Sequence, residues 1–98
     1  MKPIPKPVIV YDPPRRAWIR GQPCCVCEPG KQASATECAH VQTRRNAGDH
    51  ENLVPICVVH HREQHRLGIK SFARVHRVDL EAVAQRYHRD YDREMGWL

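Results

Sequence analysis

The sequence has few of the large apolar residues that build a protein core. Its 98 residues include one phenylalanine and four leucines, and the remaining apolar content is mostly valine, isoleucine and alanine. A single domain of this length buries a smaller fraction of its surface than a larger protein does, so a large self-sufficient core is excluded. Small domains of this kind often depend on a metal ion or on disulfides for stability.

Long apolar runs are also missing. The N-terminus has no apolar leader segment, and no run of about 18 apolar residues could span a membrane, so we expect a cytoplasmic protein without a membrane partner. The five cysteines are an odd number. In a reducing compartment, a Cys-x-x-Cys pair accompanied by histidines is more typical of metal binding than of disulfides.

Positive charge is what the chain has in excess. Sixteen lysines and arginines stand against 11 acidic residues, for a net charge of +5, and seven histidines can add to it on protonation. This balance favours a polyanionic partner such as nucleic acid. Charge alone says nothing about the fold, so the chemistry has to come from particular residues.

The pattern predicts an arm followed by one domain. Residues 1–14 contain five prolines, which predicts an extended arm with a short strand at Val8–Tyr11. Residues 15–98 are predicted to form a single α+β domain.

Six elements of this domain are predicted from apolar periodicity, caps and breakers. In chain order they are a helix over Arg15–Arg20, strands over Thr36–Gln42 and Leu53–Ile56, and helices over Cys57–Leu67, Ser71–Arg77 and Leu80–Glu94. Gly21 and Gly68 end the first two helices, and Asp79 caps the last. The last helix carries one apolar stripe, so we expect it to pack over the core.

Two short pairs of metal-binding residues occur in separate segments. Cys24 and Cys27 lie on a turn after Pro23, and Cys57 and His60 lie at the start of a predicted helix. Thiolate and imidazole are the ligands that Zn²⁺ prefers in a tetrahedral structural site. The sequence therefore predicts a structural Zn²⁺ that stabilises the fold, because the free energy of metal binding becomes folding free energy.

The other cysteines and one histidine leave alternatives open. We interpret Cys25 as a packing residue, because a Cys-x-Cys chelate with Cys27 is uncommon, and Cys38 as a buried structural thiol. His61 could replace His60 as the partner of Cys57 at the zinc site.

Four further residues are candidates for phosphodiester chemistry. They are His40 at the end of the first strand, Asn52 before the second strand, and His61 and His65 on the following helix. Histidines four apart share a helix face and can chelate one cation. Hydrolysis of a phosphodiester needs a base and a cation, roles that suit His40 and the helix pair, while Asn52 could orient the His40 ring.

The segment ECAHVQTRRNAGDHENLVPICVVHHREQHRLGIKSF resembles the HNH endonuclease motif, in a form similar to small phage and prophage HNH proteins. The resemblance covers about half of the chain. It implies a ββα-metal (His-Me finger) core with a zinc knuckle at Cys24, Cys27, Cys57 and His60. It also implies that His40 is the general base, that Asn52 orients it, and that His61 and His65 hold a catalytic Mg²⁺ or another divalent cation.

One position departs from the family pattern. Many members have a His or Asp ligand directly before the base, whereas this chain has Ala39. The cation would then keep extra water, take a ligand such as Asp49 or His50, or bind weakly.

A basic loop, Thr43–Glu51, separates the two predicted strands. Its Arg44 and Arg45 are expected to bind phosphate oxygens of DNA without reading sequence, and Arg62, Arg66 and Lys70 could extend this surface. The expected function is a metal-dependent endonuclease of low sequence specificity. The alternatives are a noncatalytic zinc-stabilised module that binds nucleic acid and a phage recombination accessory protein.

Overall fold

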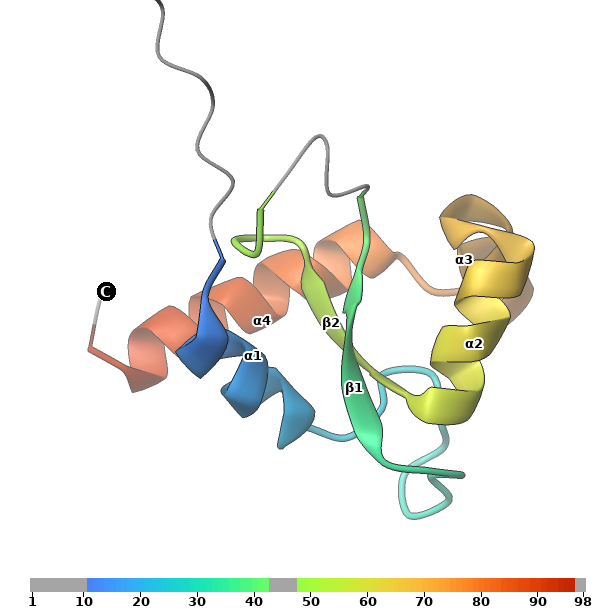
Figure 1. The fold of residues 1–98 in the computed structure, drawn as a ribbon, viewed down its shortest axis with the longest axis horizontal. Helices are drawn as coiled ribbons and strands as arrows, with labels where there is room; N and C mark the ends of the chain where they lie inside the picture. The colour runs from blue at the N-terminus through green and yellow to red at the C-terminus, as the bar shows by residue number, and fades with distance from the viewer. Residues whose placement is uncertain (1–10, 43–47, 97–98) are drawn as a thin grey trace, which may run out of the picture.

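The computed structural model describes residues 11–42 and 48–96. These residues form an α+β arrangement of two antiparallel strands and four helices (Figure 1). The bounds are α1 Pro13–Arg20, β1 Thr36–His40, β2 Leu53–Cys57, α2 Val58–Leu67, α3 Ile69–His76 and α4 Leu80–Glu94. The predicted order of strand, loop, strand and helix is confirmed.

The two strands form a hairpin whose second strand is entirely buried. Cys38 of β1 lies opposite Pro55 of β2, and His40 lies opposite Leu53. Pro55 has no N–H to donate, and its carbonyl accepts a hydrogen bond from the amide of Cys25 at 2.9 Å. Proline is compatible with a strand where no ladder N–H is needed, and here the Cys-rich turn covers that edge.

Helices surround this hairpin. In Figure 1, α2 and α3 lie on one side of it, α1 lies on the other, and α4 crosses behind. Helices α1 and α2 contact both strands, and α4 contacts β2. The buried core between these elements consists of Cys24, Ala39, Val41, Val54, Ile56, Cys57, Phe72, Leu80 and Ala84.

Helix α4 has the bounds and the cap that the sequence predicts. The Asp79 carboxylate accepts from the amide of Ala82 at 3.0 Å, which satisfies one of the unpaired amides of the first turn. Leu80, Ala84 and Tyr91 are buried, which confirms that the stripe packs on the core. Trp18 of α1 meets the Tyr91 ring edge-on, with the ring centroids 5.5 Å apart.

Three element ends differ from the prediction by two residues, and the end of β2, the start of α2 and the end of α3 differ by one. Helix α1 starts at Pro13 because proline is tolerated in a first turn and the Asp12 side chain caps the amide of Arg15. Strand β1 ends at His40 because the Asn52 side chain accepts from the next two amides. Helix α3 starts at Ile69, directly after Gly68, whose φ of 89° separates it from α2.

Some predictions fall on residues outside the described ranges. These are most of the arm 1–14, residues 8–10 of the predicted strand Val8–Tyr11, and the phosphate contacts of Arg44 and Arg45. Across the ranges that are described, no helix is both long enough and apolar enough to cross a bilayer.

Candidate functional site

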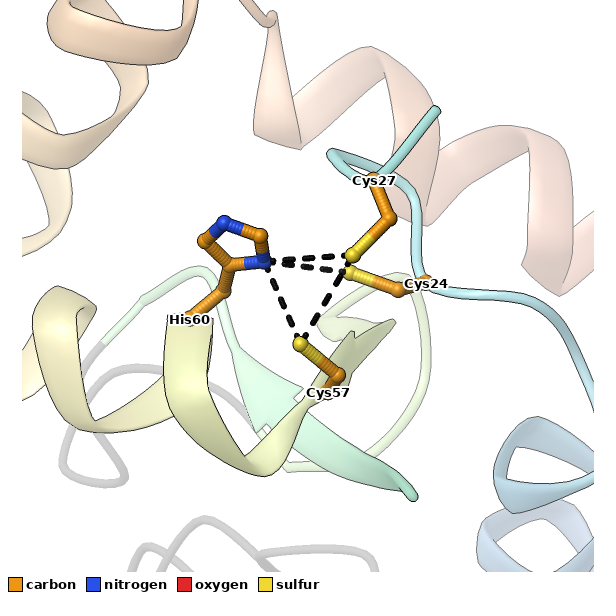
Figure 2. A group of neighbouring side chains, drawn as sticks. All are labelled: Cys24, Cys27, Cys57 and His60. Carbon is orange, nitrogen blue, oxygen red and sulfur yellow. Dashed lines mark hydrogen bonds between the residues drawn. The ribbon is translucent and has the colours of Figure 1, made fainter. Parts of the chain in front are cut away.

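Four predicted ligands converge between the Cys-rich turn and the start of α2. Cys24, Cys27, Cys57 and His60 each contribute one ligand atom, and these atoms all lie within 4.8 Å of one another (Figure 2). Within residues 11–42 and 48–96, this is the one group of three or more such side chains that could hold a metal ion. The group is a Cys₃His donor set.

The spacing of these atoms fits a tetrahedral ion. The sulfurs of Cys27 and Cys57 are 3.8 Å apart, and two thiolates bound to one zinc at about 2.3 Å would be about 3.8 Å apart. The Nδ1 atom of His60 lies 3.4 Å from the Cys27 sulfur and 3.2 Å from that of Cys57. The arrangement is consistent with a structural zinc.

Local hydrogen bonds place the two ligand pairs. The amide of Cys24 donates to the Gln32 side chain at 2.8 Å, which folds the turn back on itself. Cys57 is the last residue of β2 and the N-cap of α2, without a side-chain capping bond. His60 is one turn further along the helix, so both side chains face the turn.

This geometry decides three matters that the sequence leaves open, one for a histidine and two for cysteines. His60, not His61, faces the cysteines. Cys25 lies outside the ligand group and packs against the core, as predicted, and burial raises the pKa of its thiol to about 12. Cys38 is only partly buried, donates its S–H to the Arg16 carbonyl at 3.1 Å and lines a pocket, so it is less buried than expected.

The ligand thiols differ in acidity. Burial would raise the pKa of Cys57, but hydrogen bonds from the His60 amide, Ser34, Cys27 and the His60 ring outweigh it and lower the pKa. Burial and the neighbouring sulfurs raise the pKa of Cys27. A bound cation would remove the remaining thiol protons, since only the thiolate is a strong ligand.

A second, open site lies on the other side of α2. A pocket of about 540 Å³ is lined by His40 from β1, by His61 and His65 from α2, and also by Arg16 and Cys38. The structure therefore brings the predicted base and the predicted cation ligands to one cavity. An adjacent pocket of about 530 Å³ lies between the two residues that follow β1 and the helices α3 and α4, and its lining contains no histidine.

His40 is held at the pocket by a carboxylate. Its Nε2 atom lies 3.3 Å from Oδ1 of Asp49. Asp49 is 2% exposed, and Arg16 binds both of its oxygens, at 2.8 Å each. The amide of Asp12 donates to the same carboxylate at 2.7 Å.

The charge of Asp49 is stabilised in place. Burial would raise the pKa of this carboxyl, but hydrogen bonds from Arg16, the Asp12 amide and His40 lower it to about 2. Because these donors occupy both oxygens, the Asp49 carboxylate accepts hydrogen bonds from His40 and Arg16 and does not bind a cation. His50 is absent from the pocket lining and lies 3.4 Å from Asp12. Neither of the extra ligands considered from sequence therefore faces the open site.

Asn52 acts on the backbone around His40. Its side-chain oxygen accepts from the amides of Val41 and Gln42, at 3.0 and 2.8 Å, and its side-chain nitrogen donates to the Gly48 carbonyl at 2.8 Å. It thus fixes Val41 and Gln42, which follow His40, and Gly48, which precedes Asp49. The orientation of the His40 ring by Asn52 stays a prediction, and the Asp49 carboxylate adds a contact at Nε2 of the same ring.

Two of the three histidines of α2, His61 and His65, lie side by side at the open site. Their Nε2 atoms are 3.1 Å apart, and Nδ1 of His61 lies 3.1 Å from Oε1 of Glu37 on β1. Gln64 lies between them in sequence, is buried, and donates to the His40 carbonyl at 3.3 Å. This bond ties α2 to the end of β1.

Sequence reasoning missed the roles of Glu37 and Asp49 beside the two histidines. Each acts through a contact between segments, and no local pattern marks it. The only available signal for Asp49 was its place in the loop near His40. Comparisons with protein-family models, curated proteins and solved structures found no match to this chain.

Proposed function

We propose that the protein is a metal-dependent endonuclease of the HNH, or ββα-metal, type that hydrolyses DNA phosphodiester bonds with little sequence preference. The observation that supports this most directly is the single pocket lined by His40, His61 and His65. A base and a pair of cation ligands beside one cavity are the groups that phosphodiester hydrolysis requires. The HNH-like spacing of these residues in the sequence agrees with it.

In this proposal His40 takes a proton from the attacking water. If Nε2 carries the ring proton and donates it to Asp49, the basic lone pair belongs to Nδ1. After proton uptake, the anionic carboxylate of Asp49 stabilises the resulting imidazolium. Arg16 and Asn52 are positioning residues, because they hold Asp49 and the backbone beside His40.

His61 and His65 would hold the divalent cation. When bound, the cation neutralises charge on the phosphate and on the leaving oxygen. Arg62, Arg66 and Lys70 are exposed on α2 and α3, and they would attract the phosphate backbone without reading bases. Arg44 and Arg45 are assigned to the same task from sequence alone.

The Cys₃His group has a structural role in this proposal. A Zn²⁺ at Cys24, Cys27, Cys57 and His60 would be closed to substrate because four protein ligands complete its shell. It would join the Cys-rich turn to the strand–helix junction that carries His61 and His65. In this proposal the metal at the Cys₃His group is structural, and the cation at His61 and His65 is catalytic.

Cleavage of supercoiled plasmid by the zinc-loaded full chain tests the proposal. We expect nicking that requires an added divalent cation and that falls by about 100-fold or more in His40→Ala, because general-base catalysis contributes on that order. His50→Ala is the matched control, since His50 is an exposed histidine outside the pocket, and it should nick at the wild-type rate. Folding and zinc content are checked for each variant.

The opposite result would favour the noncatalytic nucleic-acid-binding module. That outcome is a folded, zinc-loaded wild type that cleaves no duplex, single-stranded or branched DNA and no RNA with any cation. One observation gives this alternative weight. Ala39, at the position where many HNH proteins have a ligand, is completely buried, and its side chain offers no ligand atom.

A further inference from the structure

A second pocket adjoins the one that contains His40. This pocket of about 530 Å³, between the two residues that follow β1 and the helices α3 and α4, shares the lining residues Gln42 and Ile69 with the His40 pocket. Gln42 comes two residues after His40, and Ile69 is the first residue of α3. A chain-like ligand held at His40 can therefore extend into the second pocket.

Apolar side chains form most of the lining of the second pocket. Val41 and Leu80 are buried and belong to the core, and Ile69, Ala73 and Val78 are partly buried and pack against it. Cavities of this size with apolar walls and few polar groups are typical of sites for small organic ligands. An uncharged ring fits such walls, whereas a phosphate would lose its hydration there without compensation.

The polar groups of the lining suit the edge of an uncharged ring. The side chain of Gln42 is exposed and offers both a donor and an acceptor. Asp79 and Glu81 add carboxylates, which accept hydrogen bonds from amino groups and repel phosphate. Asp79 is held in place because it caps the amide of Ala82. Nucleobases are neutral rings whose edges carry amino hydrogens and acceptors.

Helices α2 and α3 carry the positive charge that a phosphate backbone needs. Together they have four exposed cations and one acid, Glu63. Three of these cations follow one another at intervals of four residues: Arg66, Lys70 and Arg74. Lys70 also lines the second pocket, so a phosphate bound by Lys70 has its base within reach of the apolar walls.

A base inside a perfect duplex cannot enter a pocket of this kind. It is stacked and paired, and extruding it costs free energy, least where the base is already unpaired. We propose that the second pocket binds one unpaired nucleobase next to the phosphodiester that is cleaved, so that the protein selects DNA with a single-stranded or looped-out nucleotide over perfect duplex. This inference rests on the proposed function and names the substrate class of that site.

Binding of labelled DNA to the zinc-loaded full chain, with no other divalent cation, tests the pocket without cleavage. The probes are a short perfect duplex, the same duplex with one looped-out thymidine, and the same looped-out position without its base. We expect the looped-out thymidine to raise the affinity about tenfold over either other probe, since burial of the base outweighs its remaining unstacking cost. Lys70→Ala should weaken binding of all three probes by a similar factor, because phosphate contacts do not depend on the base.

A variant that fills the pocket has a matched control on the same helix. Ala73→Phe should remove the preference for the looped-out thymidine and leave the affinity for perfect duplex unchanged. Val75→Phe should keep the preference, because Val75 is 63% exposed and lies outside the pocket lining. Gln42→Ala, a change at an exposed residue that is safe for folding, should reduce the preference about threefold, the effect of one lost hydrogen bond.

Equal affinity of the wild type for the three probes would overturn the base pocket. So would a preference that a folded Ala73→Phe variant keeps or, if that variant does not fold, one that Gln42→Ala leaves unchanged. A preference that depends on the pocket, in a protein that cleaves no nucleic acid, would uphold the pocket and overturn the nuclease. Nicking that depends on His40, in a protein that binds the three probes equally, would do the reverse.

Discussion

Asp49 connects two parts of the chain through one buried carboxylate. It is bound by Arg16 and the Asp12 amide at the start of α1, and by His40 at the end of β1. Its pKa falls to about 2 because these hydrogen bonds outweigh the effect of burial. A carboxyl group whose pKa is lower in the folded than in the unfolded state stabilises the fold at every pH at which it is ionised in both states.

Replacing Asp49 with asparagine should destabilise the protein by about 2 kcal/mol at pH 7, which is the size implied by its lowered pKa. The variant also leaves the partly buried guanidinium of Arg16 without its carboxylate. Urea unfolding of the zinc-loaded proteins measures the difference. Asp90→Asn is the control, because the Asp90 side chain is 44% exposed and the Arg93 guanidinium lies 4.0 Å from it, and it should change the unfolding free energy by less than about 0.5 kcal/mol.

The pH dependence of this difference has a definite sign. The folded pKa lies below the unfolded value, so the stabilisation is complete above the unfolded pKa, about 4, and is lost as the pH falls toward 2. The difference between wild type and Asp49→Asn should therefore be constant from pH 5 to pH 8. A difference that rises through this window would assign the effect to another titrating group.

At the scale of elements, Arg15 joins α1 to α4. Its guanidinium is buried, lies 3.2 Å from Asp12 and 2.8 Å from Asp92, and stands 4.3 Å from the centre of the Tyr91 ring. It also lies 3.0 Å from Nδ1 of His88. Burial lowers the pKa of His88, in keeping with a neutral ring that accepts from Arg15 through Nδ1.

Arg15→Met should lower the unfolding free energy by about 3 kcal/mol, because breaking a buried ion pair leaves its partners unpaired. Methionine keeps most of the aliphatic length, so the loss reports mainly on charge and hydrogen bonds. Arg89→Met tests the same substitution at an exposed position of α4 and should have little effect. If both variants unfold at the same urea concentration as wild type, the Arg15 cluster does not hold α1 against α4.

The elements themselves were largely predictable from sequence. Asp79, the apolar stripe after it and Gly68 are local signals, and they give α4 and the end of α2 correctly. The prediction was less accurate at the end of β1. The strand stops there because the side chain of Asn52, more than ten residues after His40, accepts hydrogen bonds from the amides of Val41 and Gln42. A contact of that kind leaves no mark on the local pattern.

At the scale of the whole molecule, the Cys₃His group closes the fold. It brings together Cys24 and Cys27 from the turn after α1 with Cys57 and His60 from the junction of β2 and α2. The sequence has one phenylalanine, and Phe72 is the one that fills the core. Metal binding can supply the stability that such a small core lacks.

Removal of the metal should unfold the protein. We expect a strong chelator, or Cys57→Ala, to abolish the cooperative thermal transition seen by circular dichroism, and mass spectrometry should find no zinc on the variant. Cys38→Ala is the matched control, because Cys38 lies outside the ligand group, and it should retain one zinc and the transition. A chelated wild type that melts as before would show that the core is sufficient without metal.

The sequence by itself determined the two ligand pairs, the order of strand, loop, strand and helix, and the candidate residues His40, His61 and His65. These features depend on residue type and short spacing, which a linear pattern records. The tertiary structure decided that His60 rather than His61 faces the cysteines, that Asp49 contacts His40, and that Glu37 contacts His61. These choices depend on the rotation of α2 relative to the hairpin and on the position of Asp49 beside α1 and β1. Both are set by packing between segments far apart in sequence, for which no local signal exists.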